Sequence, residues 1–375
     1  MDEQVHNKRR VSMAWWFAGL YVLLVIYASL HPFTGWRLQG IVPWAFLLAP
    51  WPQYWTGFDV LINLAGYAPL GWLLTIAIGR TGSGRWAWTS VIVASALSLL
   101  MEMLQTLMVL RVPSQVDWLL NTAGAALGML LGLLMLRMGW LQPWTRFRES
   151  ALARQNGLGF MLIVTWPVAM LYPTSVPFGL GHVWGRLELF VHRLTQDSFM
   201  ANWQPLTLPE VPLSPLSEAV VVALCVWAPL LLGLSLLRGI SARARFLVVA
   251  APVVVISMSL STGLTYGPVH AWAWLTPSAV LGLLIAGGLT LLSLKLSHRS
   301  AAVLSLLAWA FALGLINQSP EVAYFAQSLQ QWEQGRFIHF HGLSKWVGWL
   351  WPYAAMGVAL HRVVRAEPAL YNSKD

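Results

Sequence analysis

Long apolar stretches, separated by short polar or proline-rich segments, follow one another along almost the whole chain. A helix needs roughly 20 apolar residues to cross a bilayer, and about ten stretches reach or approach that length. They lie at about residues 11–30, 58–79, 86–110, 117–137, 158–173, 217–237, 246–265, 271–294, 301–317 and 346–363. The pattern predicts an all-α, polytopic integral membrane protein with about ten transmembrane helices.

The composition agrees with this prediction, because 57% of the residues are apolar and only 10% are charged. Soluble proteins carry about a quarter of charged residues. The first stretch follows Lys8, Arg9 and Arg10, as a signal peptide would. Its apolar run of about 20 residues is longer than the ~7–15 of a signal sequence, and no A-x-A cleavage site follows it. We therefore expect a retained membrane anchor.

Lysine and arginine are distributed unevenly over the predicted loops, and the cytoplasmic side of a membrane protein carries the excess. If the N- and C-termini are cytoplasmic, most of the 23 Lys and Arg residues fall on the inner side. The exceptions on the outer side are Arg37, Arg111, Arg186, Arg193, Arg336 and Lys345. This asymmetry predicts that both termini are cytoplasmic.

The net charge of +9 does not indicate nucleic-acid binding, since the sequence has no clustered basic face with interleaved aromatic residues. The single cysteine, Cys225, excludes a disulfide framework and a cysteine-based metal site. His339 and His341 are spaced to bind a metal on a strand, but this pair alone is a weak signal, and we expect loop or interfacial histidines. The same holds for the other outer histidines, which are His31, His182 and His192. We predict no metal and no cofactor.

Polar side chains concentrate at the outer ends of the second, third and fourth predicted spans. The candidate ligand-binding residues are Asp59, Asn63, Glu102, Gln105, Arg111, Asp117 and Asn121. Glu102 lies eight residues before Leu110, the expected end of the third span, and so about 12 Å below that end. A carboxylate at that depth should face protein or water rather than lipid, and it is a functional-site hypothesis by default.

The turn between the third and fourth spans reads RVPSQVD, and its Ser114 and Asp117 have the spacing of a capping box. Farther along, Gly124, Gly128 and Gly132 fall on one face of the fourth span, where small residues let another helix approach closely. Because three consecutive spans each present a polar outer end, we predict that a shared bundle brings these ends together.

Three outer segments carry apolar residues without forming spans. Residues 31–57 are broken by prolines, so this segment should lie in the outer interface or re-enter the membrane. Residues 183–196 and 321–334 are amphipathic, which suits helices that lie on the outer leaflet.

Four motifs occur in order within residues 11–137. They are D…N…Y-x-P-L-G in the second span, E-x-x-Q in the third, R-x-P-S-x-x-D in the turn and N-x-x-G-x-x-x-G in the fourth. Together they resemble the VanZ-like family, named for a teicoplanin-resistance accessory protein. The resemblance implies a cell-envelope protein in the bacterial cytoplasmic (inner) membrane with an antibiotic-resistance-type role, and it implies no reaction.

A basic linker at residues 138–157 is the best candidate for a domain boundary. We expect a VanZ-like four-helix transmembrane domain at residues 1–140. A second transmembrane domain, of about six helices with interfacial outer loops, should occupy residues 141–375.

Three interpretations of the polar residues stay open. In a structural one, Asp117 caps a helix and neutralises Arg111, while Glu102 hydrogen-bonds to Asn121 or Gln105. In the second, Arg111 clamps a phosphate or carboxylate of a ligand with its planar guanidinium. In the third, Glu102 acts as a general base, Asp117 is a second catalytic candidate, and Arg111 stabilises developing charge.

We favour a non-catalytic protein that binds or shields a lipid-linked or amphipathic ligand of lipoglycopeptide type at the outer leaflet. The alternative is a membrane-embedded enzyme that acts on envelope lipids or glycans with Glu102, Arg111 and Asp117. A transporter ranks last, because no ionisable residue continues a path inward from Glu102. The expected partner is a membrane lipid or a lipid-linked envelope glycan and no nucleic acid, and a membrane-protein partner or a second copy of the chain stays open.

Overall fold

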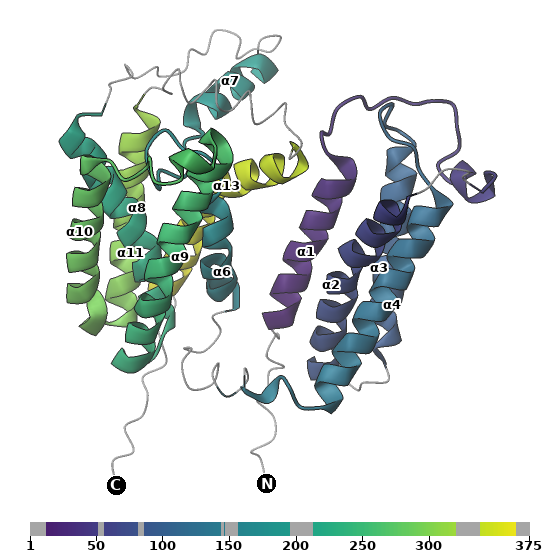
Figure 1. Ribbon diagram of the computed structural model, residues 1–375, viewed down its shortest axis with the longest axis horizontal. Helices are drawn as coiled ribbons and strands as arrows, with labels where there is room; N and C mark the ends of the chain where they lie inside the picture. The colour runs from purple at the N-terminus through teal and green to yellow at the C-terminus, as the bar shows by residue number, and fades with distance from the viewer. Residues whose placement is uncertain are drawn as a thin grey trace. The chain divides into compact units, whose positions relative to one another are not determined.

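The computed structural model describes residues 13–51, 56–81, 86–143, 146, 157–195, 213–319 and 338–364 (Figure 1). Within these ranges the regular structure is helical, and an isolated antiparallel bridge joins Trp36 to Met108. Eight helices of the described part are long and apolar enough to cross a membrane. The prediction of an all-α polytopic membrane protein is confirmed, whereas ten spans and cytoplasmic termini stay predictions.

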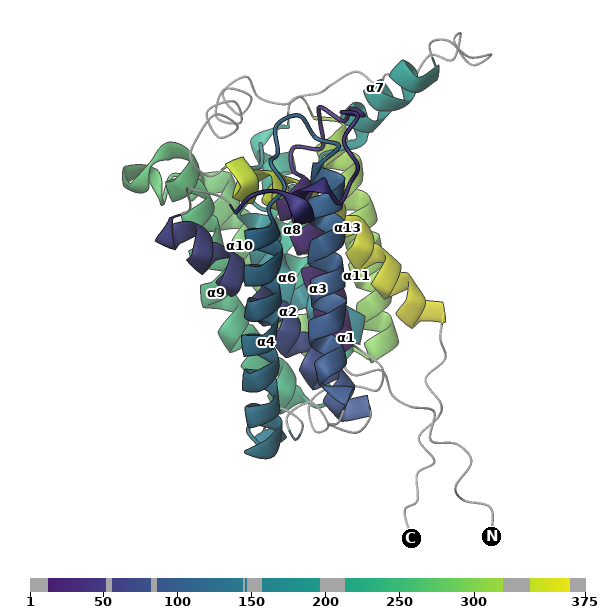
Figure 2. The ribbon, with the colours of Figure 1, turned by 90° about the vertical axis from the view of Figure 1, so that its right-hand side faces the viewer.

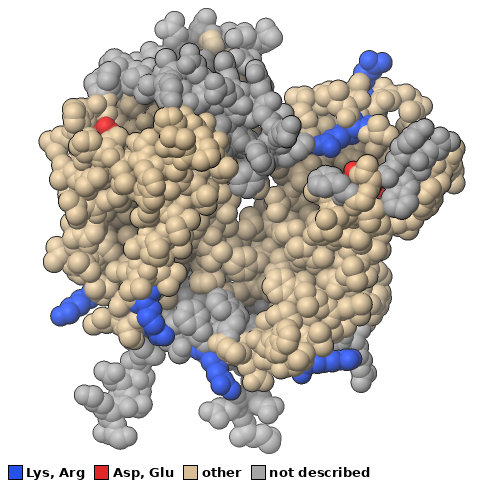
Figure 3. Space-filling model, in the orientation of Figure 1, with Lys and Arg blue, Asp and Glu red and all other residues tan. Residues whose placement is uncertain are grey.

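The chain forms two compact units, Met1–Ser150 and Ala151–Asp375, and each is described by itself. On the face of each unit that Figure 3 shows, charged side chains lie near the ends, and other residues cover the middle. This distribution fits helices that cross a bilayer, because a charge at the bilayer centre costs at least ~2.5 kcal/mol.

Unit 1 contains the four predicted N-terminal spans as helices. They are α1 (Met13–Leu30), α2 (Gly57–Thr81), α3 (Trp88–Gln105) and α4 (Gln115–Arg137), with a short 3₁₀ helix, η1 (Ala45–Leu48), in the first outer loop. Helix α4 packs most extensively on α2 and also on α3, and α1 packs on α2. Figure 2 shows α2, α3 and α4 side by side.

Helix α3 ends at Gln105, so the prediction that the third span continues to Leu110 was wrong. The residues after it pair instead with the first outer loop. The Arg37 amide donates to the Leu107 carbonyl at 2.8 Å, and the Val109 amide donates to the Gly35 carbonyl at 3.3 Å. These loop contacts replace the next helical turn and hold the first outer loop against the α3–α4 connection.

The glycine stripe on α4 is the surface on which α2 packs. A Cβ atom at Gly124 would overlap the Leu64 carbonyl, and one at Gly128 would overlap the Ala68 carbonyl. The approach is mutual, because a Cβ atom at Gly71 of α2 would overlap the Ala125 carbonyl. Close backbone contact of this kind is how small residues stabilise helix pairs in membranes, and it fixes α2 and α4 beside each other.

Unit 2 is built around one buried helix. Its helices are α6 (Gly157–Met170), α7 (Trp184–Thr195), α8 (Pro215–Leu236), α9 (Ile240–Tyr266), α10 (Pro277–Leu292), α11 (His298–Asn317) and α13 (Ile338–Val364), with the 3₁₀ turns η3 (Pro268–His270) and η4 (Ser293–Lys295). Most of α8 from Ala219 to Leu236 is buried, including Cys225. A helix that is apolar on all sides belongs in a core, and α10 and α11 pack on this one most extensively.

Helix α6 has 14 residues, or ~21 Å of rise, and is shorter than the ~30 Å hydrocarbon layer. It ends at Met170, so the predicted helical stretch to residue 173 was too long. The chain continues without regular structure to residue 183, yet Phe178 and Leu180 there are fully buried. The backbone N–H and C=O groups of a buried irregular segment need hydrogen-bond partners within the protein. Asn317 of α11 is one such partner. Its side-chain oxygen accepts hydrogen bonds from the Val183 and Trp184 amides at 3.1 and 2.9 Å.

The structure bears on several smaller predictions. The amphipathic segment at 183–196 contains α7, which exposes Trp184, Leu187 and Phe190. The second amphipathic segment, 321–334, lies outside the described residues. His339 and His341 belong to α13 and not to a strand.

Candidate functional site

Three carboxylates lie at the same end of unit 1, because α2 and α4 begin where α3 ends. Their exposed fractions decrease from Asp59 through Asp117 to Glu102. Asp59, in the first turn of α2, is exposed; Asp117, in the first turn of α4, is half-buried; and Glu102, in the last turn of α3, is 5% exposed. Polar groups therefore lead from the surface into the helix bundle.

Glu102 is buried by protein near a helix end. It lies three residues before the end of α3, or ~4.5 Å of rise, so the predicted depth of ~12 Å below the span's end was too large. Its Oε2 accepts a hydrogen bond from the backbone amide of Ser114 at 2.8 Å. Ser114 is the N-cap of α4, and its Oγ accepts from the amides of Val116 and Asp117. Glu102 thus joins the end of α3 to the start of α4.

The predicted capping box is present only in part. Ser114 caps α4 as expected, but in a complete box the acid three residues later accepts from the N-cap amide. Here that amide donates to Glu102 of the neighbouring helix. Asp117 instead accepts a hydrogen bond from Asn63 Nδ2 of α2 at 3.0 Å.

A second polar layer lies one helical turn farther inward. Ser98, Tyr67 and Asn121 each stand four residues from Glu102, Asn63 and Asp117, which is ~6 Å along a helix. Asn121 Nδ2 donates to Ser98 Oγ at 2.9 Å, and the Tyr67 hydroxyl lies beside Ser98. Tyr67 and Asn121 are each only 6% exposed, and Ser98 is fully buried.

This inner layer has unsatisfied hydrogen-bonding capacity. The Tyr67 hydroxyl and Asn121 Oδ1 are buried without a hydrogen-bond partner. Buried polar atoms nearly always have a hydrogen-bond partner. These two atoms therefore indicate that a further hydrogen-bonding group binds beside them. Our list of candidate residues omitted Tyr67 and Ser98. Their spacing of four residues from Asn63 and Glu102 is the signal that identifies them.

Asp59 stabilises the start of α2 through hydrogen bonds with Thr56. Its Oδ2 accepts from the amide and the hydroxyl of Thr56, both at 2.8 Å, and its own amide donates to Thr56 Oγ1 at 3.2 Å. This is a complete capping box at the start of α2. Asp59 still acts electrostatically on Asp117, so it adds negative charge to the mouth of the site.

Gln105 and Arg111 form their hydrogen bonds with backbone carbonyls at the end of α1. Gln105 Nε2 donates to the Ser29 carbonyl at 2.9 Å. Arg111 Nη2 donates to the carbonyls of His31 at 2.7 Å and Ala28 at 3.5 Å. Arg111 acts on the charge of Glu102 only at longer range, and its hydrogen bonds hold the connection after α1.

The hydrogen bonds expected under the structural interpretation are therefore not those that form. Asp117 accepts from Asn63 rather than from Arg111. Glu102 accepts from the Ser114 amide rather than from Asn121 or Gln105. The site that remains is rich in acceptors, and it suits a ligand that presents hydrogen-bond donors or positive charge. Within the described residues, no group of three or more His, Cys, Asp or Glu is arranged to hold a metal ion.

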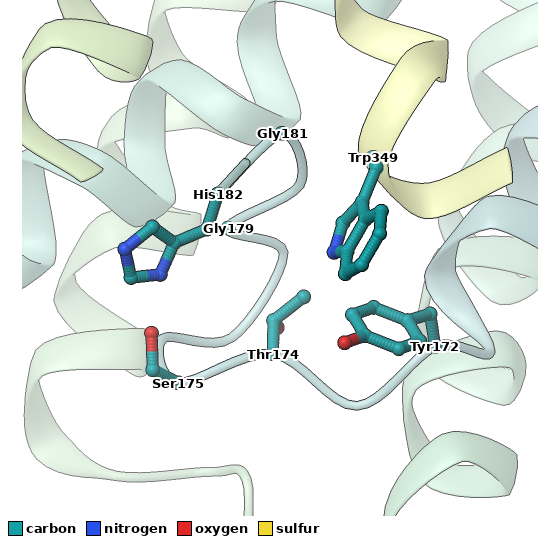
Figure 4. Close-up of a pocket in the computed structure, with 7 residues that line it drawn as sticks. All are labelled: Tyr172, Thr174, Ser175, Gly179, Gly181, His182 and Trp349. Carbon is teal, nitrogen blue, oxygen red and sulfur yellow. The ribbon is translucent and has the colours of Figure 1, made fainter. Parts of the chain in front are cut away.

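Unit 2 has a small pocket that includes a histidine from the predicted outer set (Figure 4). It is lined by Tyr172, Thr174, Ser175, Gly179, Gly181, His182 and Trp349. His182 and Ser175 lie on one side of it, and Tyr172 and Trp349 lie on the other, with their rings edge to face at 6.2 Å. The lining offers hydroxyls and one imidazole and no carboxylate, so its chemistry differs from that of the acidic site.

Residues 4–137 match the model of the VanZ/LLP1 family. This region is VanZ-like. The match confirms the resemblance drawn from the four motifs, and it ends with the last residue of α4. The polar site thus lies entirely within the VanZ-like region, and the eight candidate spans of the described residues fit a multi-pass membrane protein. No curated protein and no solved structure matches the chain.

Proposed function

We propose that the VanZ-like region binds the polar part of an amphipathic or lipid-linked ligand at the outer leaflet of the bacterial inner membrane. The observation that carries this proposal is the gradient from exposed Asp59 through half-buried Asp117 to buried Glu102. A carboxylate held inside a membrane bundle is costly and is seldom kept for packing alone. Because Asp59 at one end of this series is exposed, a ligand can reach the buried carboxylate from the surface.

The apolar surroundings of the site support an amphipathic ligand. The loop paired with the α3–α4 connection exposes Leu38, Ile41 and Leu48, and the connection itself exposes Leu110 and Val112. Apolar residues around a polar site provide contacts for an acyl chain while the carboxylates contact the head group. The role is to hold or shield such a ligand, which is of lipoglycopeptide type.

The contacts of the charged groups favour a donor-rich head group over an anionic one. Arg111 already donates to two backbone carbonyls, so the clamp for phosphate or carboxylate that we considered would have to break these contacts. Glu102 and Asp117, in contrast, present acceptor oxygens. Binding is also favoured over general-base catalysis, because the Glu102 carboxylate orders the start of α4 through Ser114.

The test is ligand binding by the purified full chain in nanodiscs, with a fluorescent teicoplanin-type lipoglycopeptide as the probe. Glu102→Gln keeps the side-chain shape and removes the charge, and it should weaken binding about tenfold, since a hydrogen bond to a charged group contributes ~1.5–3 kcal/mol. Glu218→Gln, a carboxylate in the first turn of α8, is the matched control and should bind as the unmodified chain does. Equal binding by all three proteins would exclude the proposal.

A further inference from the structure

The two unpartnered atoms of the inner layer specify the chemistry of the missing group. Asn121 Oδ1 is an acceptor only, and the Tyr67 hydroxyl both donates and accepts. Tyr67 and Asn121 both flank Ser98, and Tyr67 interacts electrostatically with Glu102. The Tyr67 hydroxyl of α2 and the Asn121 side chain of α4 therefore lie at Ser98 of α3, one turn from Glu102 on the same helix.

Charge limits the choice further. Glu102 is 5% exposed and accepts its hydrogen bond from a backbone amide, not from a cation. Asp117 adds negative charge near it, and the guanidinium of Arg111 is hydrogen-bonded to backbone carbonyls. A buried carboxylate is stabilised by a paired positive charge. A neutral hydroxyl would satisfy Tyr67 and Asn121 but would leave Glu102 without that charge.

We propose that Tyr67, Asn121 and Glu102 recognise a primary ammonium group carried by an amphipathic ligand. An ammonium has three N–H donors and one compact charge, which match three acceptors on three helices. A guanidinium is larger and planar, and a quaternary ammonium has no donors. The inference rests on the proposed ligand-binding function and adds the chemical class of the head group.

The test compares dodecylamine with dodecyltrimethylammonium and dodecyl maltoside, each added to the full chain in nanodiscs at neutral pH. The two cations share charge and chain length, but only the primary amine can donate. We expect the amine to bind at least about tenfold more tightly than its trimethyl analogue, because each hydrogen bond to a charged group is worth about one order of magnitude. Tyr67→Phe should remove most of this preference.

Tyr27→Phe is the matched control. The Tyr27 hydroxyl, on α1, is also buried without a hydrogen-bond partner, so its removal tests the loss of such a hydroxyl away from the site. This variant should keep the preference for the amine. Circular dichroism and elution as a single species show whether each variant is folded, and Asn121→Leu provides a second site variant if Tyr67→Phe does not fold.

Two further arms distinguish sources of the amine. Phosphatidylethanolamine against phosphatidylcholine tests a phospholipid head group, and an alkyl glucosaminide against its N-acetylated form tests an amino sugar. Equal affinity for the two dodecyl cations would overturn the inference. Water would then be the hydrogen-bond partner of the Tyr67 hydroxyl and Asn121 Oδ1. If the maltoside or the lipoglycopeptide still bound in a manner that depended on Glu102, the proposed function would stand without the amine specificity. Loss of all binding would remove both.

Discussion

The Glu102 carboxylate accepts a hydrogen bond from the backbone amide of Ser114 at 2.8 Å, although the two residues belong to different helices. The first amides of a helix lack intrahelical partners, and Glu102 satisfies one of them from outside α4. Asn317 does the same for α7, because it accepts from the amides of Val183 and Trp184. In both units a distant polar side chain fixes where a helix begins.

The first prediction concerns the stability contributed by Glu102. Glu102→Ala leaves the Ser114 amide without its acceptor, which should lower the free energy of unfolding by about 1–3 kcal/mol. Glu102→Gln keeps an acceptor oxygen and should stay within about 1 kcal/mol of the unmodified chain. Equilibrium unfolding in mixed micelles measures both. If the two variants lost the same stability, the hydrogen bond to Ser114 would not be the cause.

The second prediction concerns the contact between α2 and α4. A methyl group at Gly128 would overlap the Ala68 carbonyl, and Gly128→Ala should therefore destabilise unit 1 by about 1–3 kcal/mol, as overpacking does. Gly19→Ala is the control, because a Cβ atom there meets nothing within 4 Å. The control should be neutral or slightly stabilising. A neutral Gly128→Ala in the same unfolding assay would contradict the packing.

The third prediction concerns the buried irregular segment that ends at residue 183. Asn317 holds it in two ways, since its oxygen accepts from Val183 and Trp184 and its amide donates to the Gly181 carbonyl at 3.2 Å. Asn317→Leu removes these bonds and should cost about 2–4 kcal/mol. Asn317→Asp keeps the acceptor and should cost less. Hydrogen exchange at Val183 and Trp184 should accelerate strongly only in the Leu variant, and unchanged exchange there would disprove the contact.

The helices were largely predictable from the sequence, whereas the contacts of the site were not. Apolar runs locate spanning helices because the bilayer sets their length. They did not show that α3 ends at Gln105, because the residues that stop it pair with a loop some 70 positions earlier (Arg37 with Leu107). The glycines of α4 indicated a close neighbour but not which helix it was.

The same limit applied to individual site residues. The three carboxylates were correctly expected at one end of the bundle, because α2, α3 and α4 alternate in direction. Arg111 was expected to meet an acid or a ligand, yet it donates to backbone carbonyls near the end of α1. Sequence spacing relates residues on one helix, whereas partners on different helices depend on rotation and packing.

The fourth prediction concerns orientation in the membrane. Replacing Cys225, the single cysteine, by Ala gives a background for single-cysteine labelling. Val112→Cys, at an 86% exposed position after α3, should react with an impermeant maleimide added outside intact cells. Met138→Cys, 53% exposed after α4, should react only after the membrane is permeabilised. The reverse pattern would place the site on the cytoplasmic side.

Binding from one side of the membrane tests the central claim most directly. Right-side-out proteoliposomes of the unmodified chain, Glu102→Gln and Glu218→Gln receive a fluorescent lipoglycopeptide from outside, and bound probe is measured by anisotropy. The account predicts saturable binding to the unmodified and Glu218→Gln chains and about tenfold weaker binding to Glu102→Gln. Binding that did not depend on Glu102, or that occurred only with inside-out vesicles, would contradict a ligand site at the outer end of α2, α3 and α4.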